Sequence, residues 1–183
     1  MNHLGIYSRK RGNKDYINMM FNGEKTIDIK LSDRRIAPYN AIKDGDMLYV
    51  KESGGPVVGR ILIPKVTYHE ISNPMQILDI LLTIQDRVGL DDEEHARRMF
   101  ERVSGKRYIT LFELTEPEAL ARPIRIEKYD RRVWIANYNL PIDLKLAYGL
   151  DPMFTGEMDP EMISDDEDEL DEGENTTGLG KFR

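Results

Sequence analysis

The chain of 183 residues contains no cysteine, so it has neither a disulfide framework nor a thiolate for catalysis or zinc binding. None of its apolar runs approaches the ~18 residues of a membrane-spanning helix. Its first residues, MNHLGIYSRKRG, lack the apolar core of a secretory signal. These absences predict a cytoplasmic protein that has no membrane partner.

Several motifs of common enzymes are also missing. The sequence has no GxxxxGK[ST] phosphate loop, no GxSxG nucleophile elbow and no HExxH zinc helix. His3, His69 and His95 lie far apart, and no cysteine completes a zinc site. We therefore predict no metal and no cofactor, and we expect His69 to be an ordinary histidine at the rim of the core.

Charge is divided unevenly along the chain. The net charge is −7, but residues 151–183 hold twelve Asp/Glu and two Lys/Arg, which leaves 21 acidic and 24 basic residues in 1–150. Because the acidic segment has little to bury, we predict a disordered acidic tail over 155–183. Three roles stay open for this tail: solubilising the chain, competing with phosphate for the basic body, and binding a basic protein partner.

Hydrophobic periodicity predicts a body of mixed α and β structure. Strands are expected where apolar residues alternate or form short runs bounded by turn residues, at 3–7, 26–31, 46–52, 57–66 and 109–114. A further hairpin is expected from 123–129 and 133–139. Helices are expected at 14–22, 74–88 and 91–103.

The helix at 91–103 begins with the acidic segment DDEE. We assign Asp91 as its N-cap and Glu94 as the capping-box partner. Negative charge is favourable at a helix N-terminus, so this segment is explained without a metal ion.

The stretch GEKTIDIK, residues 23–30, raises a functional question. On a strand, its side chains divide into an apolar and a polar face: Ile27, Ile29 and Leu31 against Thr26, Asp28 and Lys30. The polar face is either solvated or the floor of a polar pocket, with Lys25 beside it.

This stretch and its surroundings resemble the ASCH domains of the PUA-like superfamily. The family pattern is G-x-K-T-x-E-x-R, followed by G-D before the next strand. The matching residues, with aspartate for the glutamate and lysine for the arginine, are Gly23, Lys25, Thr26, Asp28, Lys30, Gly45 and Asp46. The resemblance covers roughly residues 14–115.

The resemblance implies an α+β fold, with a small β-barrel flanked by helices and a pocket beside the motif strand. It also implies RNA binding, or processing of RNA or modified nucleosides. We accordingly expect an ASCH/PUA-like domain over 1–115, an additional β-hairpin region over 116–154 packed on it, and the tail over 155–183.

The leading functional hypothesis is a nucleic-acid-binding module for RNA or a modified nucleotide. Lysine and arginine supply cations for phosphate, and a threonine hydroxyl can hydrogen-bond a base or sugar. The candidate binding residues are Arg9, Lys10, Arg11, Lys14, Lys25, Thr26, Lys30 and Arg60.

An enzyme is the second hypothesis. The resemblance implies that some relatives hydrolyse an acylated cytidine with a lysine, a threonine and a glutamate. Lys25 stands at the lysine position, Asp28 occupies the threonine position, and the glutamate is Glu93, Glu94 or neither. A nucleoside amidohydrolase or ribonuclease would then use Lys25 and Asp28 as its acid–base pair.

Arg132, Trp134 and Tyr138 share one face of the expected strand at 133–139. They form either a surface on which bases stack or, for the single tryptophan, part of the core.

Overall fold

A computed structural model describes residues 1–11, 14–127 and 132–150. The tail expected over 155–183 and most of the turn expected near 130 lie outside the described residues. No helix in the described part of the chain combines the length and the hydrophobicity needed to span a membrane.

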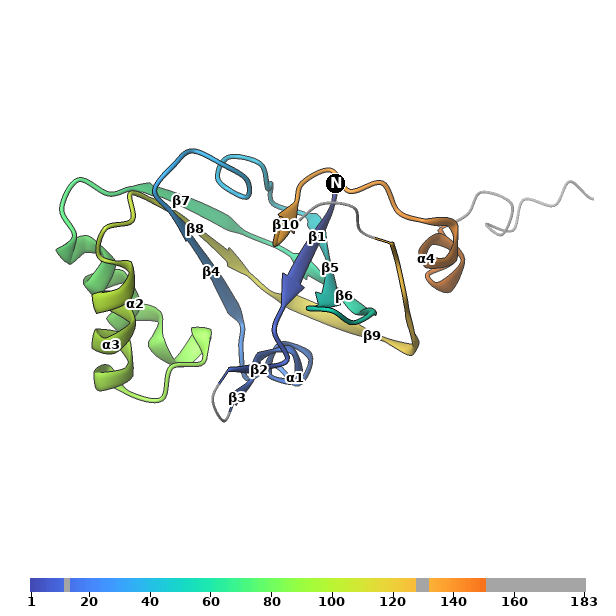
Figure 1. Cartoon of the computed structure of the whole chain (residues 1–183), viewed down its shortest axis with the longest axis horizontal. Helices are drawn as coiled ribbons and strands as arrows, with labels where there is room; N and C mark the ends of the chain where they lie inside the picture. The colour runs from blue at the N-terminus through green and yellow to red at the C-terminus, as the bar shows by residue number, and fades with distance from the viewer. Residues whose placement is uncertain (12–13, 128–131, 151–183) are drawn as a thin grey trace, which may run out of the picture.

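The described residues form a mixed α+β fold (Figure 1). The strands are β1 (Asn2–Tyr7), β2 (Lys10–Arg11), β3 (Lys14–Asp15), β4 (Ile27–Ser32), β5 (Asp46–Glu52), β6 (Val57–Ile63), β7 (Val66–Glu70), β8 (Tyr108–Glu113), β9 (Thr115–Ile124) and β10 (Trp134–Ile135). The helices are α1 (Tyr16–Phe21), α2 (Met75–Val88), α3 (Glu93–Val103) and α4 (Ile142–Ala147).

The strands pair into two main sheets and one short ladder. The five-stranded sheet has the order β10-β1-β5-β6-β9, the three-stranded sheet has the order β4-β8-β7, and β2 pairs with β3. The pair β1–β5 is parallel, whereas the other pairs are antiparallel.

The two main sheets are joined at one corner and open at the other. Two chain segments each contribute a strand to both sheets. One passes from β6 to β7 through Pro64 and Lys65, and the other passes from β8 to β9 through Leu114. On the opposite side, β4 and β1 diverge (Figure 1) and do not pair. The expected closed barrel is therefore not formed by the strand pairings of the described residues.

Three hydrophobic clusters hold these layers together. The first lies between the two sheets and includes Leu48, Ile61 and Phe112. The second, which includes Ile77 and Ile109, joins the three-stranded sheet to α2 and α3. The third joins the five-stranded sheet to α4 and includes Leu4, Tyr49 and Leu144. Each main sheet is thus covered on both faces.

The segment around the GEKTIDIK stretch folds largely as its pattern predicts. Asp15 caps α1 by accepting a hydrogen bond from the backbone N–H of Asn18, and Gly23, at φ 81°, turns the chain after the helix. The apolar side chains of β4 then contact the cluster beneath α2 and α3: Ile27, Ile29 and Leu31.

Two details of the expected elements are wrong. The N-cap of α3 is Asp92, whose carboxylate accepts from the backbone N–H of His95, while Asp91 pairs with Lys14. The strand expected at 57–66 is divided into β6 and β7, because Pro64 lacks the N–H that a continuous ladder requires.

The described residues of 123–129 and 133–139 also do not form the expected hairpin. The chain up to Ile124 belongs to β9, which pairs with β6 at one edge of the five-stranded sheet. Residues 134–135 form β10, which pairs with β1 at the opposite edge. The apolar character of both segments therefore reflects packing on the same sheet and not pairing with each other.

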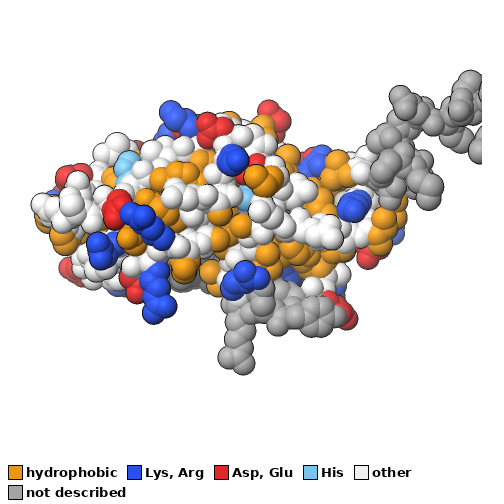
Figure 2. All heavy atoms as spheres, turned by 90° about the horizontal axis from the view of Figure 1, so that it is seen from above, with side chains coloured by type: hydrophobic (Ala, Val, Ile, Leu, Met, Phe, Trp, Pro, Cys, Tyr) orange, Lys and Arg blue, Asp and Glu red, His pale blue; other side chains and the backbone are white. Residues whose placement is uncertain are grey.

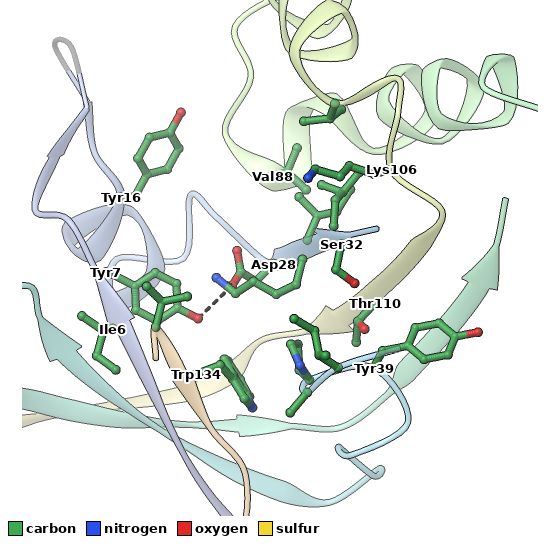
Figure 3. A pocket seen from close by; sticks show the side chains of 18 of the residues that line it. Ile6, Tyr7, Tyr16, Asp28, Ser32, Tyr39, Val88, Lys106, Thr110 and Trp134 are labelled. Carbon is green, nitrogen blue, oxygen red and sulfur yellow. Dashed lines mark hydrogen bonds and ion pairs between the residues drawn. The ribbon is translucent and has the colours of Figure 1, made fainter. Parts of the chain in front are cut away.

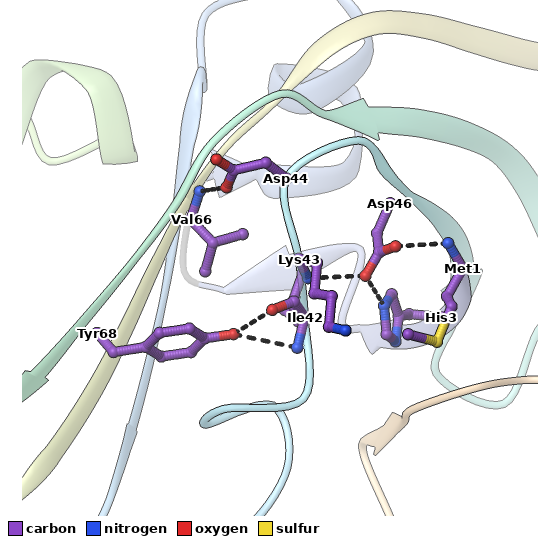
Figure 4. Close-up of polar contacts among 8 residues, drawn as sticks. All are labelled: Met1, His3, Ile42, Lys43, Asp44, Asp46, Val66 and Tyr68. Carbon is purple, nitrogen blue, oxygen red and sulfur yellow. Dashed lines mark hydrogen bonds and ion pairs between the residues drawn. The ribbon is translucent and has the colours of Figure 1, made fainter.

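The turn before β5 is fixed by its two aspartates (Figure 4). Asp46 accepts from the backbone N–H of Lys43 at 2.7 Å and contacts the buried imidazole of His3 at 2.8 Å. Asp44 accepts from the backbone N–H of Val66 at 2.8 Å. Gly45, at φ 82°, supplies the left-handed conformation between them. This turn anchors β5 to both β1 and β7.

Candidate functional site

A cavity of about 910 Å³ lies beside the open side of the fold, between β4 and the β1–β10 edge. Figure 3 shows Tyr7 and Trp134 on one side of it, with Ser32 and Thr110 on the other. Its ionisable lining consists of four bases and one acid: Lys25, Lys30, Lys106, Arg132 and Asp28. Several aromatic rings also contribute: Tyr7, Tyr16, Tyr39 and Trp134.

Asp28 is the centre of a buried polar cluster. One of its carboxylate oxygens lies 3.0 Å from the ammonium of Lys25. The other lies 2.8 Å from the ammonium of Lys30 and accepts a 2.8 Å hydrogen bond from the hydroxyl of Tyr7. Both oxygens of Asp28 are thus occupied.

These contacts set the charge of the cluster. Burial alone would raise the pKa of Asp28, but the ammonium groups of Lys25 and Lys30 and the Tyr7 hydroxyl outweigh it and hold this pKa well below its usual range. Burial and the neighbouring Asp28 charge raise the pKa of Tyr7. Asp28 is therefore a fixed anion and Tyr7 a fixed hydroxyl donor.

Lys25 is enclosed at the floor of the cavity. Its side chain is only 5% exposed, and its ammonium donates to the carbonyl of Ile27 at 2.7 Å and to that of Val88 at 3.4 Å. Burial lowers the pKa of Lys25, and the Asp28 carboxylate opposes that shift. Lys25 therefore connects the start of β4 to the end of α2.

Lys30 is more accessible than Lys25 and lies among aromatic rings. Its side chain is 26% exposed, and its ammonium lies 4.3 Å from the ring centre of Tyr7 and 6.0 Å from that of Trp134. Such cation–π contacts and the ion pair with Asp28 hold the ammonium at the cavity wall.

The far end of the cavity is formed by the segment after β4. Tyr39 packs edge-on against Tyr68 and Tyr108, with ring centres 5.3 and 5.0 Å apart. Lys106 also lines the cavity, and its ammonium is 3.9 Å from the carboxylate of Asp33. The lining therefore includes a supported aromatic ring and a partly exposed cation.

The structure brings together only some of the candidate residues. Lys25, Asp28 and Lys30 line one cavity. Thr26 does not line it, and its hydroxyl instead accepts from the guanidinium of Arg87 at 3.2 Å.

Three other candidate cations, Arg9, Lys14 and Arg60, do not line the cavity. Arg9 pairs with Glu52 at 3.0 Å, Lys14 donates to the carbonyl of Gly89 at 2.7 Å, and Arg60 pairs with Glu118 at 2.7 Å. Lys10 and Arg11 form the β2 strand, which pairs with β3. On the face shown in Figure 2, Lys and Arg side chains lie at separate points among hydrophobic and neutral ones.

The glutamates considered for catalysis face away from this cluster. Glu93 and Glu94 contact Arg97 and Arg98 on the exposed surface of α3, and neither lines the cavity. Among the described residues, no group of three or more His, Asp or Glu side chains could hold a metal ion.

The two interpretations of Trp134 both describe part of its environment. Trp134 is 3% exposed and belongs to the cluster between the sheets, yet it also lines the cavity with Arg132. Tyr138 instead packs against the cluster beneath α4. The three residues therefore do not form one stacking surface.

Sequence reasoning missed several lining residues. Tyr7 and Tyr16 flank the basic loop that was considered for its charge, and Tyr39 and Lys106 follow segments without a strong pattern. The alternation of β1, which places Tyr7 on the same face as His3 and Gly5, was the available signal, and it gave no information about the partner Asp28.

Comparisons with solved structures agree with the expected fold. The ASCH protein of Zymomonas mobilis superposes with a TM-score of 0.54 at 13% identity, covering 81% of this chain and 93% of that one. A single-residue variant of the same protein gives a TM-score of 0.53 at 16% identity, covering 80% and 94%. No protein-family model and no curated protein sequence matches this chain. The chain therefore has the fold of these ASCH structures.

Proposed function

We propose that this protein is a nucleic-acid-binding module that takes a nucleotide of single-stranded RNA into the cavity beside β4. One observation carries the proposal: among the described residues, four basic side chains, a single acid and four aromatic rings line the same cavity. Basic groups attract phosphate and aromatic rings stack on bases. A volume of about 910 Å³ is at the upper end of the usual range for ligand pockets.

The charge of the cavity favours an anion. Asp28 neutralises one of the two lysines beside it, so the cluster of Lys25, Asp28 and Lys30 retains one positive charge. A neutral nucleoside has no negative charge to pair with this positive charge, whereas a nucleotide has a phosphate that pairs with it.

The same geometry favours binding over catalysis by Asp28. A general base must accept a proton near neutral pH, but the pKa of Asp28 is held far below that range and both of its oxygens are engaged. The amidohydrolase or ribonuclease hypothesis would therefore need another base.

The test is equilibrium binding of a fluorescent single-stranded RNA of roughly ten nucleotides, a length within the usual range of site sizes. We expect the logarithm of the affinity to fall linearly with the logarithm of the salt concentration, and Lys106→Ala to reduce that slope by about 0.7. Lys65→Ala is the matched control, because Lys65 is exposed and does not line the cavity.

Two results would contradict the proposal. The first is equal loss of binding in the Lys106 and Lys65 variants, since the contact would then lie outside the cavity. The second is no binding by the wild-type protein at low salt. Formation of a cleaved or deacylated product by the wild-type protein would instead support the enzymatic alternative.

A further inference from the structure

The cavity passes the outer edge of β4. Asp28 and Lys30 face the space between the sheets, whereas Ile29 and Leu31 contact the cluster beneath α2 and α3. All four residues nevertheless line the same cavity. Because β4 is the edge strand of its sheet, a cavity that touches both of its faces runs along its backbone edge.

The hydrogen-bond pattern identifies which backbone groups point to that edge. The carbonyl of Thr26 accepts from the backbone N–H of Leu114, so Thr26 is directed toward the β8 side. Orientation alternates along an antiparallel pair, which directs Asp28 and Lys30 to β8 and the intervening residues outward. The Ile27 carbonyl agrees with this assignment, because it is contacted by the Lys25 ammonium.

Only a short part of this edge is available to a ligand. Lys25 already occupies the carbonyl of Ile27, which ends the edge on that side. Ile29 and Leu31 then each present one N–H donor and one carbonyl acceptor, and no strand of the described residues pairs with them. Backbone groups in a partly enclosed site need partners, so this edge favours a ligand with its own donors and acceptors.

We infer that the outer edge of β4 at Ile29 and Leu31 reads the Watson–Crick edge of one unpaired base; this inference rests on the proposed function. Every natural base carries neighbouring donor and acceptor groups on that edge. Tyr39 offers a ring on the lining of the same cavity, and Lys106 offers a cation for the adjoining phosphate.

A peptide strand fits this edge less well. Strand addition uses main-chain hydrogen bonds along an extended segment, whereas here two residues are free and Lys25 closes one end. The inferred binding mode also predicts selectivity for unpaired bases, because a base in a duplex already uses its Watson–Crick edge for pairing. The ligand is therefore single-stranded, and a methyl group on that edge blocks it.

The test uses the full-length protein and does not require a mutation. Amide signals are followed by NMR and by hydrogen exchange during titration with the tightest-binding of four homo-oligonucleotides. We expect slower exchange for the amides of Ile29 and Leu31, and little change in exchange for those of Asp28 and Lys30, which already face β8. The latter two are internal controls on the same strand.

Affinity for modified RNA provides the second readout. A methyl group on the Watson–Crick ring nitrogen of the same base should weaken binding by about tenfold or more, because a recognised group is left unpaired. A methyl group on the opposite edge, at C5 of a pyrimidine or C8 of a purine, is the control for bulk.

The possible failures are distinguishable. If RNA binds with the expected dependence on Lys106 but the two amides and the methylated RNA show no effect, the inference is wrong and the proposed function stands. If no RNA binds at low salt, both are wrong.

Discussion

Asp28 is the residue on which the charge of the cavity depends. The alternating pattern of β4 predicted its place on a polar strand face beside Lys30, and both residues line the cavity. The pattern could not predict the hydroxyl of Tyr7, because that contact joins residues 21 positions apart on strands that do not pair. Only the packed fold brings these groups together.

Asp28→Asn should lower the free energy of unfolding by about 3–5 kcal/mol, because it leaves two ammonium groups without their counter-ion in a largely buried site. Denaturant unfolding at neutral pH measures this change. Lys65→Gln, at an exposed position, is a control in which we expect a change within about 0.5 kcal/mol.

The pH dependence of stability gives a second test of the same residue. The folded-state pKa of Asp28 is depressed, so its contribution is fully present above the unfolded-state pKa of about 3.9 and is lost as pH falls through the lower folded-state pKa. The wild-type protein should therefore lose stability below about pH 4 more steeply than Asp28→Asn. Parallel curves for the two proteins would show that Asp28 is not stabilised as an anion.

At the scale of elements, most helices and strands could be predicted because their patterns are local. β5 has the expected bounds, 46–52, and Gly89, at φ 83°, ends α2 as expected. The pairing of β9 with β6 and of β10 with β1 could not be predicted, since each depends on the curvature of a sheet assembled from distant segments.

Asp91 and Asp92, which are neighbours at the start of α3, have different structural roles. Asp92→Ala should destabilise the protein by about 1 kcal/mol, because the backbone N–H of His95 loses its acceptor. Asp91→Ala removes an ion pair in which the Asp91 side chain is 64% exposed, so it should cost less. Thermal or denaturant unfolding of both variants measures the two losses of stability. An equal loss, or a larger loss for Asp91→Ala, would contradict the assignment of Asp92 as the N-cap.

Gly59 on β6 is required by the approach of α1. A β-carbon at this position would lie 2.6 Å from the backbone carbonyl oxygen of Glu118 and would also collide with the ring of Phe21. Gly59→Ala should therefore destabilise the protein by about 1–3 kcal/mol. Gly105→Ala is the matched control, because nothing lies within 4 Å of the added carbon, and an equal loss there would contradict this reason.

For the whole molecule, the sequence predicted the α+β class and the ASCH-type fold, because the order of motif, turn and strands is a property of the chain. It did not predict the open side between β4 and β1, where the cavity lies. Nor did it predict that several basic candidates would pair with nearby acids: Arg9, Lys14 and Arg60. The cavity therefore depends on how distant segments of the chain pack together and not on one sequence motif.

The uneven charge of the chain also predicts that the acidic segment weakens RNA binding in a salt-dependent way. Residues 155–183 hold eleven acidic and two basic residues, a net of −9, so their removal changes the net charge from −7 to +2. We expect the 1–154 fragment to bind single-stranded RNA more tightly than the full chain at low salt, with the difference disappearing as salt screens the charges. Equal RNA binding by the fragment and the full chain at low salt would show that the acidic segment does not affect RNA binding.

The most direct test of the cavity as the RNA site is photo-crosslinking of a 4-thiouridine-containing oligonucleotide to the full-length protein, with the attached peptides identified by mass spectrometry. The account predicts crosslinks on the cavity lining, above all at the partly exposed Tyr39 and Lys106, and their loss with excess unlabelled RNA. Competed crosslinks confined to α4 and β9, with none on the lining, would contradict it.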